Sequence, residues 1–207
     1  MPMKFLIPLF VMFINTVMVA QKPDTLWYES GAIKAVGSRV EGEKDGSWKY
    51  LYPNGTLNAE FIYHADRMEG VQRFYSFEGT LIGEENYENG LLEDSAFYYY
   101  PSGQLEKKGR FMNGLYEGKW VFFYENGKLK RSGGYAEGLP EGFWSFHFEN
   151  GQLNQEGILK AGKEDGLWNY YDEDGSPLYE GSWLIGEKVG QWYYFKKGKK
   201  KPWKNFD

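Results

Sequence analysis

Residues 120–129 read Trp-Val-Phe-Phe-Tyr-Glu-Asn-Gly-Lys-Leu, and this stretch decides the fold. Aromatic and β-branched residues favour strands. An Asn-Gly pair between two apolar runs is the strongest short-range signal for a β-hairpin, because a type I′ turn needs positive φ at both central residues. The same pair occurs at Asn54-Gly55 and Asn150-Gly151, so the sequence predicts a hairpin that recurs.

The hairpin recurs every 24 residues, as three glycine series and one tryptophan series show. The first glycine series is Gly31, Gly55, Gly79, Gly103, Gly127, Gly151 and Gly175. The second is Gly46, Gly70, Gly118, Gly142, Gly166 and Gly190, with Asp94 in the missing place, and the third is Gly42, Gly90, Gly114, Gly138, Gly162 and Gly186, with Asp66 in its place. The tryptophans are Trp48, Trp120, Trp144, Trp168 and Trp192, with Gln72 and Ala96 filling the gaps. Such a fixed period indicates a repeat protein.

Each unit is therefore expected to be a strand, an Asn-Gly turn, a second strand and a Gly-rich turn. No stretch after the N-terminal segment has a helical period. A single hairpin cannot bury its own apolar face, so about seven repeats must stack side by side. The predicted fold is all-β, one elongated antiparallel sheet of roughly 15 strands, about 70 Å long at ~4.8 Å per strand.

A resemblance follows from these residues. Residues 179–190 read Tyr-Glu-Gly-Ser-Trp-Leu-Ile-Gly-Glu-Lys-Val-Gly, which resembles the MORN repeat, Tyr-Glu-Gly-x-Trp-x-x-Gly-x-x-x-Gly. The longer unit resembles the bacterial variant in the YwqK-like antitoxin family, and the resemblance covers residues 24–198. It implies a scaffold that binds a protein partner, and the antitoxin branch implies that this partner is a toxin.

The N-terminus has the pattern of a secretory signal peptide. Lys4 precedes a largely apolar run from Phe5 to Val19, and Ala20 closes it. That order of charged, apolar and small residues is typical of a cleaved signal, and the run is short for a membrane span. We expect residues 1–20 to be removed near Ala20 and the protein to be exported to the periplasm, the cell surface or the medium. Retention as an anchor is the alternative.

Charge divides the rest of the chain into an acidic repeat domain, 21–198, and a basic tail, 199–207. Residues 21–195 hold 17 Lys and Arg against 28 Asp and Glu, whereas the residues after 195 hold six Lys and one Asp. An acidic surface argues against nucleic acid, because phosphate contacts need basic residues. The lysines are Lys196, Lys197, Lys199, Lys200, Lys201 and Lys204. They are expected either to cap the end of the sheet or to contact an anionic membrane or glycan.

One row of aromatic residues is the candidate partner-binding site. Alternation along the first strand of each repeat places Trp120, Phe122 and Tyr124 on one face, which is expected to be buried. The opposite face carries Tyr75, Tyr99, Phe123, His147, Tyr171 and Phe195 at equivalent positions. An exposed aromatic row marks an interface. The alternative is that these rings only pack against neighbouring strands.

The sequence offers little for catalysis or metal binding. There is no cysteine, and the two histidines, His64 and His147, have no second ligand at zinc spacing. The acidic stretch Asp172-Glu173-Asp174-Gly175 lacks the spacing of a calcium loop and takes the place of a hairpin turn. No nucleophile elbow or phosphate loop is present. The expectation is no enzyme, no metal and no cofactor.

Three functions follow in order of preference. The first is a protein-interaction module, including antitoxin-like neutralisation of a toxin. The second is a surface module that binds anionic lipid or glycan through aromatic rows and the lysine tail. The third is an enzyme. The sequence leaves open the identity of the partner and the oligomeric state.

Overall fold

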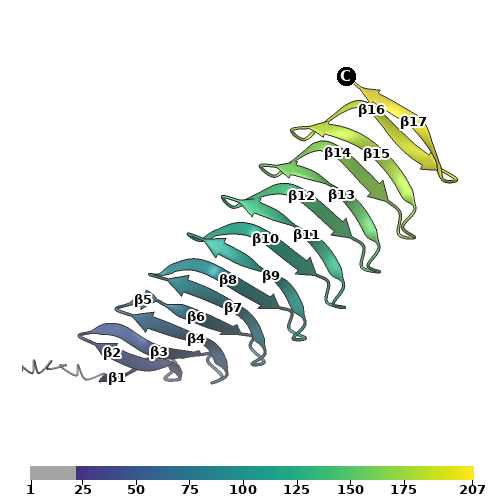
Figure 1. Cartoon of the computed structure of the whole chain (residues 1–207). Helices are drawn as coiled ribbons and strands as arrows, with labels where there is room; N and C mark the ends of the chain where they lie inside the picture. Colours follow the sequence, from purple (N-terminus) through teal and green to yellow (C-terminus); the bar gives the residue numbers. More distant parts are fainter. Residues whose placement is uncertain (1–21) are drawn as a thin grey trace, which may run out of the picture.

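The chain folds as one open antiparallel sheet of 17 strands, which confirms the predicted fold class. The computed structural model describes residues 22–207. Neighbours in sequence are neighbours in the sheet, so the strands follow one another along its long axis (Figure 1). The expected signal peptide, residues 1–20, lies outside the described residues.

The strands are short and nearly equal in length. They are β1 Lys22–Trp27, β2 Ile33–Val40, β3 Glu43–Leu51, β4 Leu57–His64, β5 Arg67–Met68, β6 Gly70–Tyr75, β7 Leu81–Glu88, β8 Leu91–Tyr99, β9 Leu105–Met112, β10 Leu115–Phe123, β11 Leu129–Ala136, β12 Leu139–His147, β13 Leu153–Lys160, β14 Lys163–Tyr171, β15 Pro177–Leu184, β16 Glu187–Lys196 and β17 Lys199–Phe206. β5 and β6 are two pieces of one strand position, because both pair with β4. No helix that could cross a membrane occurs within residues 22–207.

The two kinds of turn differ from the prediction in their geometry. At Asn54-Gly55 only the glycine has positive φ (87°), and the Gly55 N–H donates to the Tyr52 carbonyl while the Tyr52 N–H donates to Thr56. This is a three-residue loop with the glycine in the left-handed bulge position, not a type I′ turn. Asn54 Oδ1 accepts from the Thr56 N–H at 3.0 Å, which stabilises the loop.

The two positive φ angles of a type I′ turn occur instead in the second, Gly-rich turn of each repeat. Ala161 and Gly162 both have positive φ (47° and 79°), as do Ile185 and Gly186 (50° and 84°). These loops hold only two residues between paired strands, and a two-residue hairpin favours positive φ at both. An alanine or isoleucine is strained in this conformation, so something else must hold it there.

A ladder of acidic side chains holds these turns. Glu141 Oε2 accepts from the Ala161 N–H at 2.9 Å, and Asp165 Oδ1 accepts from the Ile185 N–H at 3.4 Å. Glu69 and Glu93 bind the backbone N–H of Asn89 and Asn113 in the same way. Each acid lies in one repeat and binds the turn of the next, so the acidic composition of the body serves partly to join repeats.

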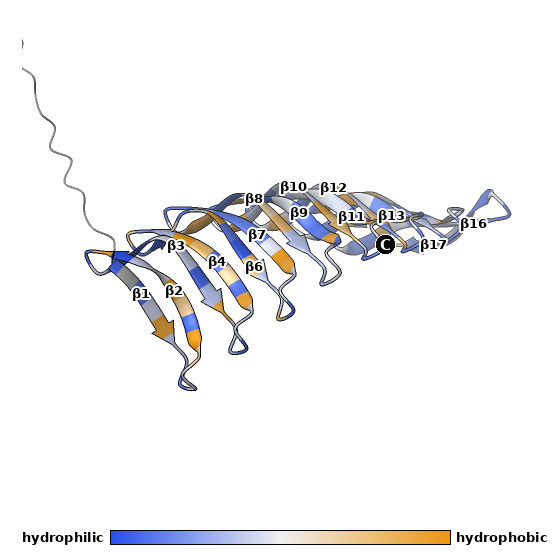
Figure 2. Ribbon diagram, turned by 90° about the horizontal axis from the view of Figure 1, so that it is seen from below, coloured by the Kyte–Doolittle hydropathy of each residue, from blue (hydrophilic) through white to orange (hydrophobic). Residues whose placement is uncertain are grey.

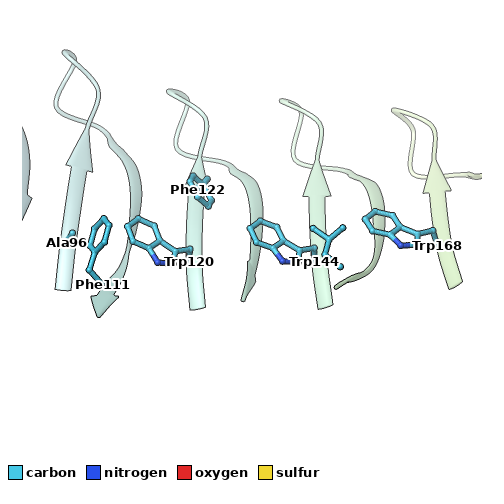
Figure 3. Packing of buried hydrophobic residues seen from close by; sticks show 7 residues of the cluster. Ala96, Phe111, Trp120, Phe122, Trp144 and Trp168 are labelled. Carbon is cyan, nitrogen blue, oxygen red and sulfur yellow. The ribbon is translucent and has the colours of Figure 1, made fainter. Parts of the chain in front are cut away.

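Tryptophans form the core of the sheet. Trp48, Trp120, Trp144, Trp168 and Trp192 are at most 2% exposed, although residues 22–207 place no second layer of structure over the sheet (Figure 2). Figure 3 shows Trp120, Trp144 and Trp168 in the same orientation on successive hairpins. Each indole N–H donates to the carbonyl ten residues earlier at 3.0–3.1 Å, as from Trp144 to Gly134. A buried indole thereby has its partner.

A further glycine series lies beneath these rings. Gly37, Gly109, Gly133, Gly157 and Gly181 each stand eleven residues before a tryptophan, and an added Cβ at any of them would overlap the indole. The two repeats without tryptophan also lack this glycine, since Phe61 precedes Gln72 and Glu85 precedes Ala96. Gln72 is fully buried and reproduces the indole bond, because its Nε2 donates to the Ile62 carbonyl at 3.3 Å. The tryptophan missing at position 72 is thus replaced locally by a side chain that makes the same hydrogen bond.

The segment 199–207, expected as a separate basic tail, is part of the sheet. Lys199–Phe206 is β17 and pairs with β16 from Lys196↔Lys199 to Gly190↔Phe206. Its apolar residues explain this: Trp203 and Phe206 lie 6.5 and 5.9 Å from the Trp192 ring centroid. Because the segment is rich in lysine, the sequence did not predict β17, which covers Trp192.

Candidate interaction surfaces

The single-layer sheet has two faces with different chemistry. The tryptophan face carries the indoles and the rings that contact them, such as Tyr170, 6.3 Å from Trp168 and 5.9 Å from Trp192. The row face carries the predicted row, Tyr75, Tyr99, Phe123, His147, Tyr171 and Phe195. Each face is a separate candidate for binding.

All six row residues lie at equivalent places on the row face and are partly buried. Three of the tyrosines donate to glutamates of the same face: Tyr75 to Glu60 at 2.9 Å, Tyr99 to Glu84 at 3.4 Å and Tyr171 to Glu156 at 2.9 Å. Burial raises the pKa of these three phenols above its usual value, and the neighbouring glutamate adds to the shift. Within residues 22–207, none of the six rings contacts another aromatic ring.

The backbone of the row is tied to the preceding repeat. The Tyr100 hydroxyl donates to the Phe123 carbonyl at 2.9 Å, and the Tyr124 hydroxyl donates to the His147 carbonyl at 2.7 Å. Tyr52 binds the Tyr75 carbonyl in the same way. These tyrosines therefore join successive repeats through the backbone of the row residues. Whether the row binds a partner stays a prediction.

Sequence reasoning missed the apolar residues beside the row. Phe143 and Ile158 are paired across β12 and β13 and are 60% and 46% exposed, and Leu167 on β14 is 52% exposed. All three lie on the row face, because their strand positions alternate with Trp144, Gly157 and Trp168. We call them the Phe143 group. The signal was available, since these are apolar residues at positions that alternation assigns to the outer face.

Two hollows lie on the row face around Phe97. One of about 270 Å³ is lined by Val71, Glu84, Ser95 and Phe97 among others, and one of about 240 Å³ is lined by Phe97, Lys108, Lys119 and Val121 among others. Phe97 is 37% exposed between them. Hollows of this size accept single side chains, which is how anchor residues of a partner dock.

The chain matches the MORN repeat variant at residues 44–65, 68–89, 95–113, 116–136 and 164–184, just over half of its length. It belongs to the MORN repeat family. MORN repeats generally serve as non-catalytic modules that contact proteins or membranes. No curated protein matches this MORN-repeat chain.

Among solved structures, the matches are remote. The crystal structure of TcdB2-TccC3-Cdc42 is 11% identical with a TM-score of 0.21, over 86% of this chain and 13% of that one. The structure of TcdB2-TccC3-TEV is 12% identical with a TM-score of 0.23, over 84% and 11%. The chain therefore spans about an eighth of the proteins it matches, and the likeness carries no functional argument.

The two histidines and the acidic stretch 172–175 of this MORN-repeat protein each contact other groups of the protein. His64 Nδ1 lies 3.2 Å from Asp45 Oδ2, and His147 Nδ1 lies 3.4 Å from the Gly151 carbonyl. Asp174 Oδ1 accepts from the Ser176 N–H at 2.8 Å, inside the hairpin turn that residues 172–175 form. Within residues 22–207 no group of three His, Cys, Asp or Glu is placed to hold a metal ion.

The six C-terminal lysines lie at one end of the sheet, all of them exposed. Lys196, Lys197 and Lys199 surround the β16–β17 turn, whereas Lys200 pairs with Glu180 and Lys204 lies 4.8 Å from the Phe206 ring centroid. Charged side chains on an edge strand oppose pairing with another sheet. Their position suits both expected roles, a cap and a contact with an anionic surface.

Proposed function

We propose that this MORN-repeat protein is a non-catalytic scaffold that binds a protein partner on its row face. The Phe143 group carries the proposal. Three large apolar side chains from adjacent strands are all about half exposed on this face, with Phe143 directly opposite Ile158 and Leu167 on the next strand. Exposed apolar patches on soluble proteins mark interaction sites. The hollows around Phe97 and the aromatic row extend the same surface toward the N-terminal half.

Charge on this face favours a basic partner. Glu156 lies beside the row, as do Glu60 and Glu84, which pair with Lys49 and Arg73. The sign of the face therefore follows the body of the chain, where residues 21–195 hold 28 acids against 17 bases. Complementary charge raises association rates and selects among partners more than it adds affinity. We therefore expect complex formation to slow as salt concentration rises.

A toxin is the partner class that the resemblance to YwqK-like antitoxins suggests. The N-terminal sequence adds a constraint, because an exported scaffold meets a toxin in the envelope or outside the cell. Export is supported by the pattern of residues 1–20. Its test is N-terminal sequencing of the protein from fractionated cells, where a start at Gln21 in the periplasm or medium supports export and a start at Met1 in the cytosol contradicts it.

The test of partner binding is a comparison of variants. Residues 21–207 are immobilised, and envelope extract and culture supernatant are passed over the wild type and over Phe143→Ser/Leu167→Ser. A stoichiometric protein retained by the wild type and lost by the double variant supports the row face. Phe77→Ser, 53% exposed in the turn between β6 and β7 and in contact with Tyr52 of the tryptophan face, is the control that should retain it. Toxicity of that protein expressed alone then decides the antitoxin role.

The aromatic row has its own variant. Tyr99→Ala/Tyr171→Ala removes two phenols of the row without touching the tryptophans. Unchanged partner binding by this folded variant would show that the row only packs against neighbouring strands.

The clustered lysines support a second candidate, contact with an anionic membrane. Each lysine near an anionic surface contributes about 1 kcal/mol, so three at one turn suffice for weak, salt-sensitive binding. The test is sedimentation with vesicles of anionic or of neutral lipid. Binding only to anionic vesicles that is lost in Lys196→Gln/Lys197→Gln/Lys199→Gln supports the membrane role, whereas equal sedimentation with neutral vesicles contradicts it.

A further inference from the structure

A cavity of about 440 Å³ opens on the tryptophan face at the C-terminal end of the sheet. Its aromatic walls are Tyr170, Tyr179, Trp183, Trp192 and Trp203, and its polar lining is Gln155, Glu164 and Lys188. It lies on the opposite face from the Phe143 group. Small-molecule sites have this size and this mixture of an apolar wall with a few converging polar groups.

The aromatic rings form a platform rather than a closed core. Trp203 on β17 is 49% exposed and lies 5.2 Å from Tyr179 and 6.5 Å from Trp192, between ring centroids. One repeat earlier, the position of Trp183 is filled by Leu159, whereas Trp203 lies at the register shift between the pairs Trp192↔Lys204 and Tyr193↔Pro202, which the preceding hairpin lacks at this place. The preceding hairpin therefore folds without either tryptophan, and Trp183 and Trp203 are not required by the repeat.

The polar groups of the cavity have unused hydrogen-bonding capacity. Among residues 22–207, the Gln155 amide and the Glu164 carboxylate have no hydrogen-bond or ion-pair partner. The Trp183 Nε1–H donates to the Tyr170 hydroxyl oxygen at 3.0 Å, so the Tyr170 proton remains available for donation. Burial raises the pKa of Tyr170 to about 12, which keeps that proton on the oxygen at neutral pH. The cavity thus offers both donors and acceptors.

The two charged side chains of the cavity, Lys188 and Glu164, disfavour ionic ligands. Lys188 Nζ lies 4.4 Å from the Trp192 ring centroid and 5.4–5.7 Å from those of Trp183, Trp203 and Phe206. It already occupies the place where aromatic rings would hold a cationic ligand. Glu164 opposes an anionic ligand. The two charges cancel, so the cavity suits an uncharged ligand.

We infer that this cavity binds a sugar ring, free or as a unit of a polysaccharide. A sugar ring has an apolar C–H face that lies on an aromatic ring, and rim hydroxyls that both donate and accept. The exposed ring of Trp203, beside Tyr179, takes the apolar face, and the buried Trp192 supports it from behind. Glu164 accepts from hydroxyls, Tyr170 and Lys188 donate to them, and the Gln155 amide does both. This inference is independent of the partner proposed for the row face.

The experiment measures tryptophan fluorescence and calorimetric heat of residues 21–207, which contain every described strand. The probes are glucose, cellohexaose, chitohexaose and maltohexaose. We expect at least one hexasaccharide to bind with a Kd of about 1 mM or below. If free glucose binds with a Kd similar to that of a hexasaccharide, the site holds a single ring. If only a hexasaccharide binds, the site contacts several units of a polymer.

Two variants test the location. Glu164→Gln removes an acceptor without changing shape, and Trp203→Ala removes part of the platform, so each should weaken binding about tenfold or more. The control variants Glu173→Gln and Trp27→Ala change exposed residues of the same types outside the cavity and should leave sugar binding unchanged. No heat or fluorescence change with any of the four sugars at about 10 mM overturns the inference. So does sugar binding that survives both Glu164→Gln and Trp203→Ala. Partner capture by the row face is unaffected in either case.

Discussion

The indole of Trp144 lies across the backbone of Gly133, in the space that a Cβ of residue 133 would occupy. Gly133 lies at an irregularity in the β11–β12 pairing, between the pairs Ser132↔Ser145 and Gly134↔Glu141, and the Trp144 Nε1–H donates to the Gly134 carbonyl at 3.1 Å. The ring therefore covers the neighbouring strand as well as its own. This contact explains how a single-layer sheet buries large side chains without a second layer.

Gly133→Ala should destabilise the protein by about 1–3 kcal/mol, because the new methyl group meets the Trp144 ring in a packed site. Trp144→Ala alone should cost about 3–5 kcal/mol. The double variant should cost little more than Trp144→Ala, since the clash is then absent. The measurement is urea unfolding followed by circular dichroism. If the double variant loses the sum of the two single losses, the glycine is needed for a reason other than its contact with the Trp144 ring.

The repeat without tryptophan offers the reverse experiment. Gln72→Trp should be destabilising, because Phe61 stands where the other repeats have glycine. Phe61→Gly/Gln72→Trp should recover part of that loss by restoring the glycine and tryptophan pair. A double variant less stable than Gln72→Trp alone in thermal unfolding would contradict the pairing.

The acid ladder should contribute measurably to stability. Glu141→Ala removes the acceptor of the Ala161 N–H, in a turn where Ala161 has positive φ, and should cost about 1 kcal/mol. Glu173→Ala changes the same charge at an exposed hairpin turn and should stay within about 0.5 kcal/mol of the wild type. Chemical denaturation of the two variants checks this. If both variants lose the same free energy of unfolding, the loss comes from the change in net charge and not from the hydrogen bond to Ala161.

Alkaline pH should unfold the protein through its buried tyrosines. Burial raises the pKa of Tyr63, Tyr87 and Tyr170 to about 12, from an ordinary value of 10.0. A raised folded-state pKa means that the folded state binds these protons more tightly. Stability is therefore full below pH 10 and falls as pH rises through 12. Absorbance at phenolate wavelengths and unfolding at each pH follow both events, and Tyr170→Phe should reduce the loss of stability over that range. An unfolding free energy that stays constant from pH 9 to 12 would contradict the burial of these phenols.

The sequence by itself determined the repeat. A period of 24 residues, the Asn-Gly pairs and strand alternation act locally, so they predicted the hairpins, the single sheet and the face that carries Trp48, Trp120 and Trp144. They also placed the row residues Tyr75, Tyr99 and Tyr171 on the opposite face.

Only the tertiary structure decided which residues meet. Three contacts depend on strand register: that of Gly133 with Trp144, the hydrogen bond that the Ala161 N–H donates to Glu141, and that of Trp203 with Trp192. Turn type was also decided at this level, because the number of residues left between paired strands selects it. The Lys199–Phe206 segment shows the same limit. Its charge suggested a basic tail, but Trp203 and Phe206 contact Trp192, and burial of that ring favours pairing of the segment with β16.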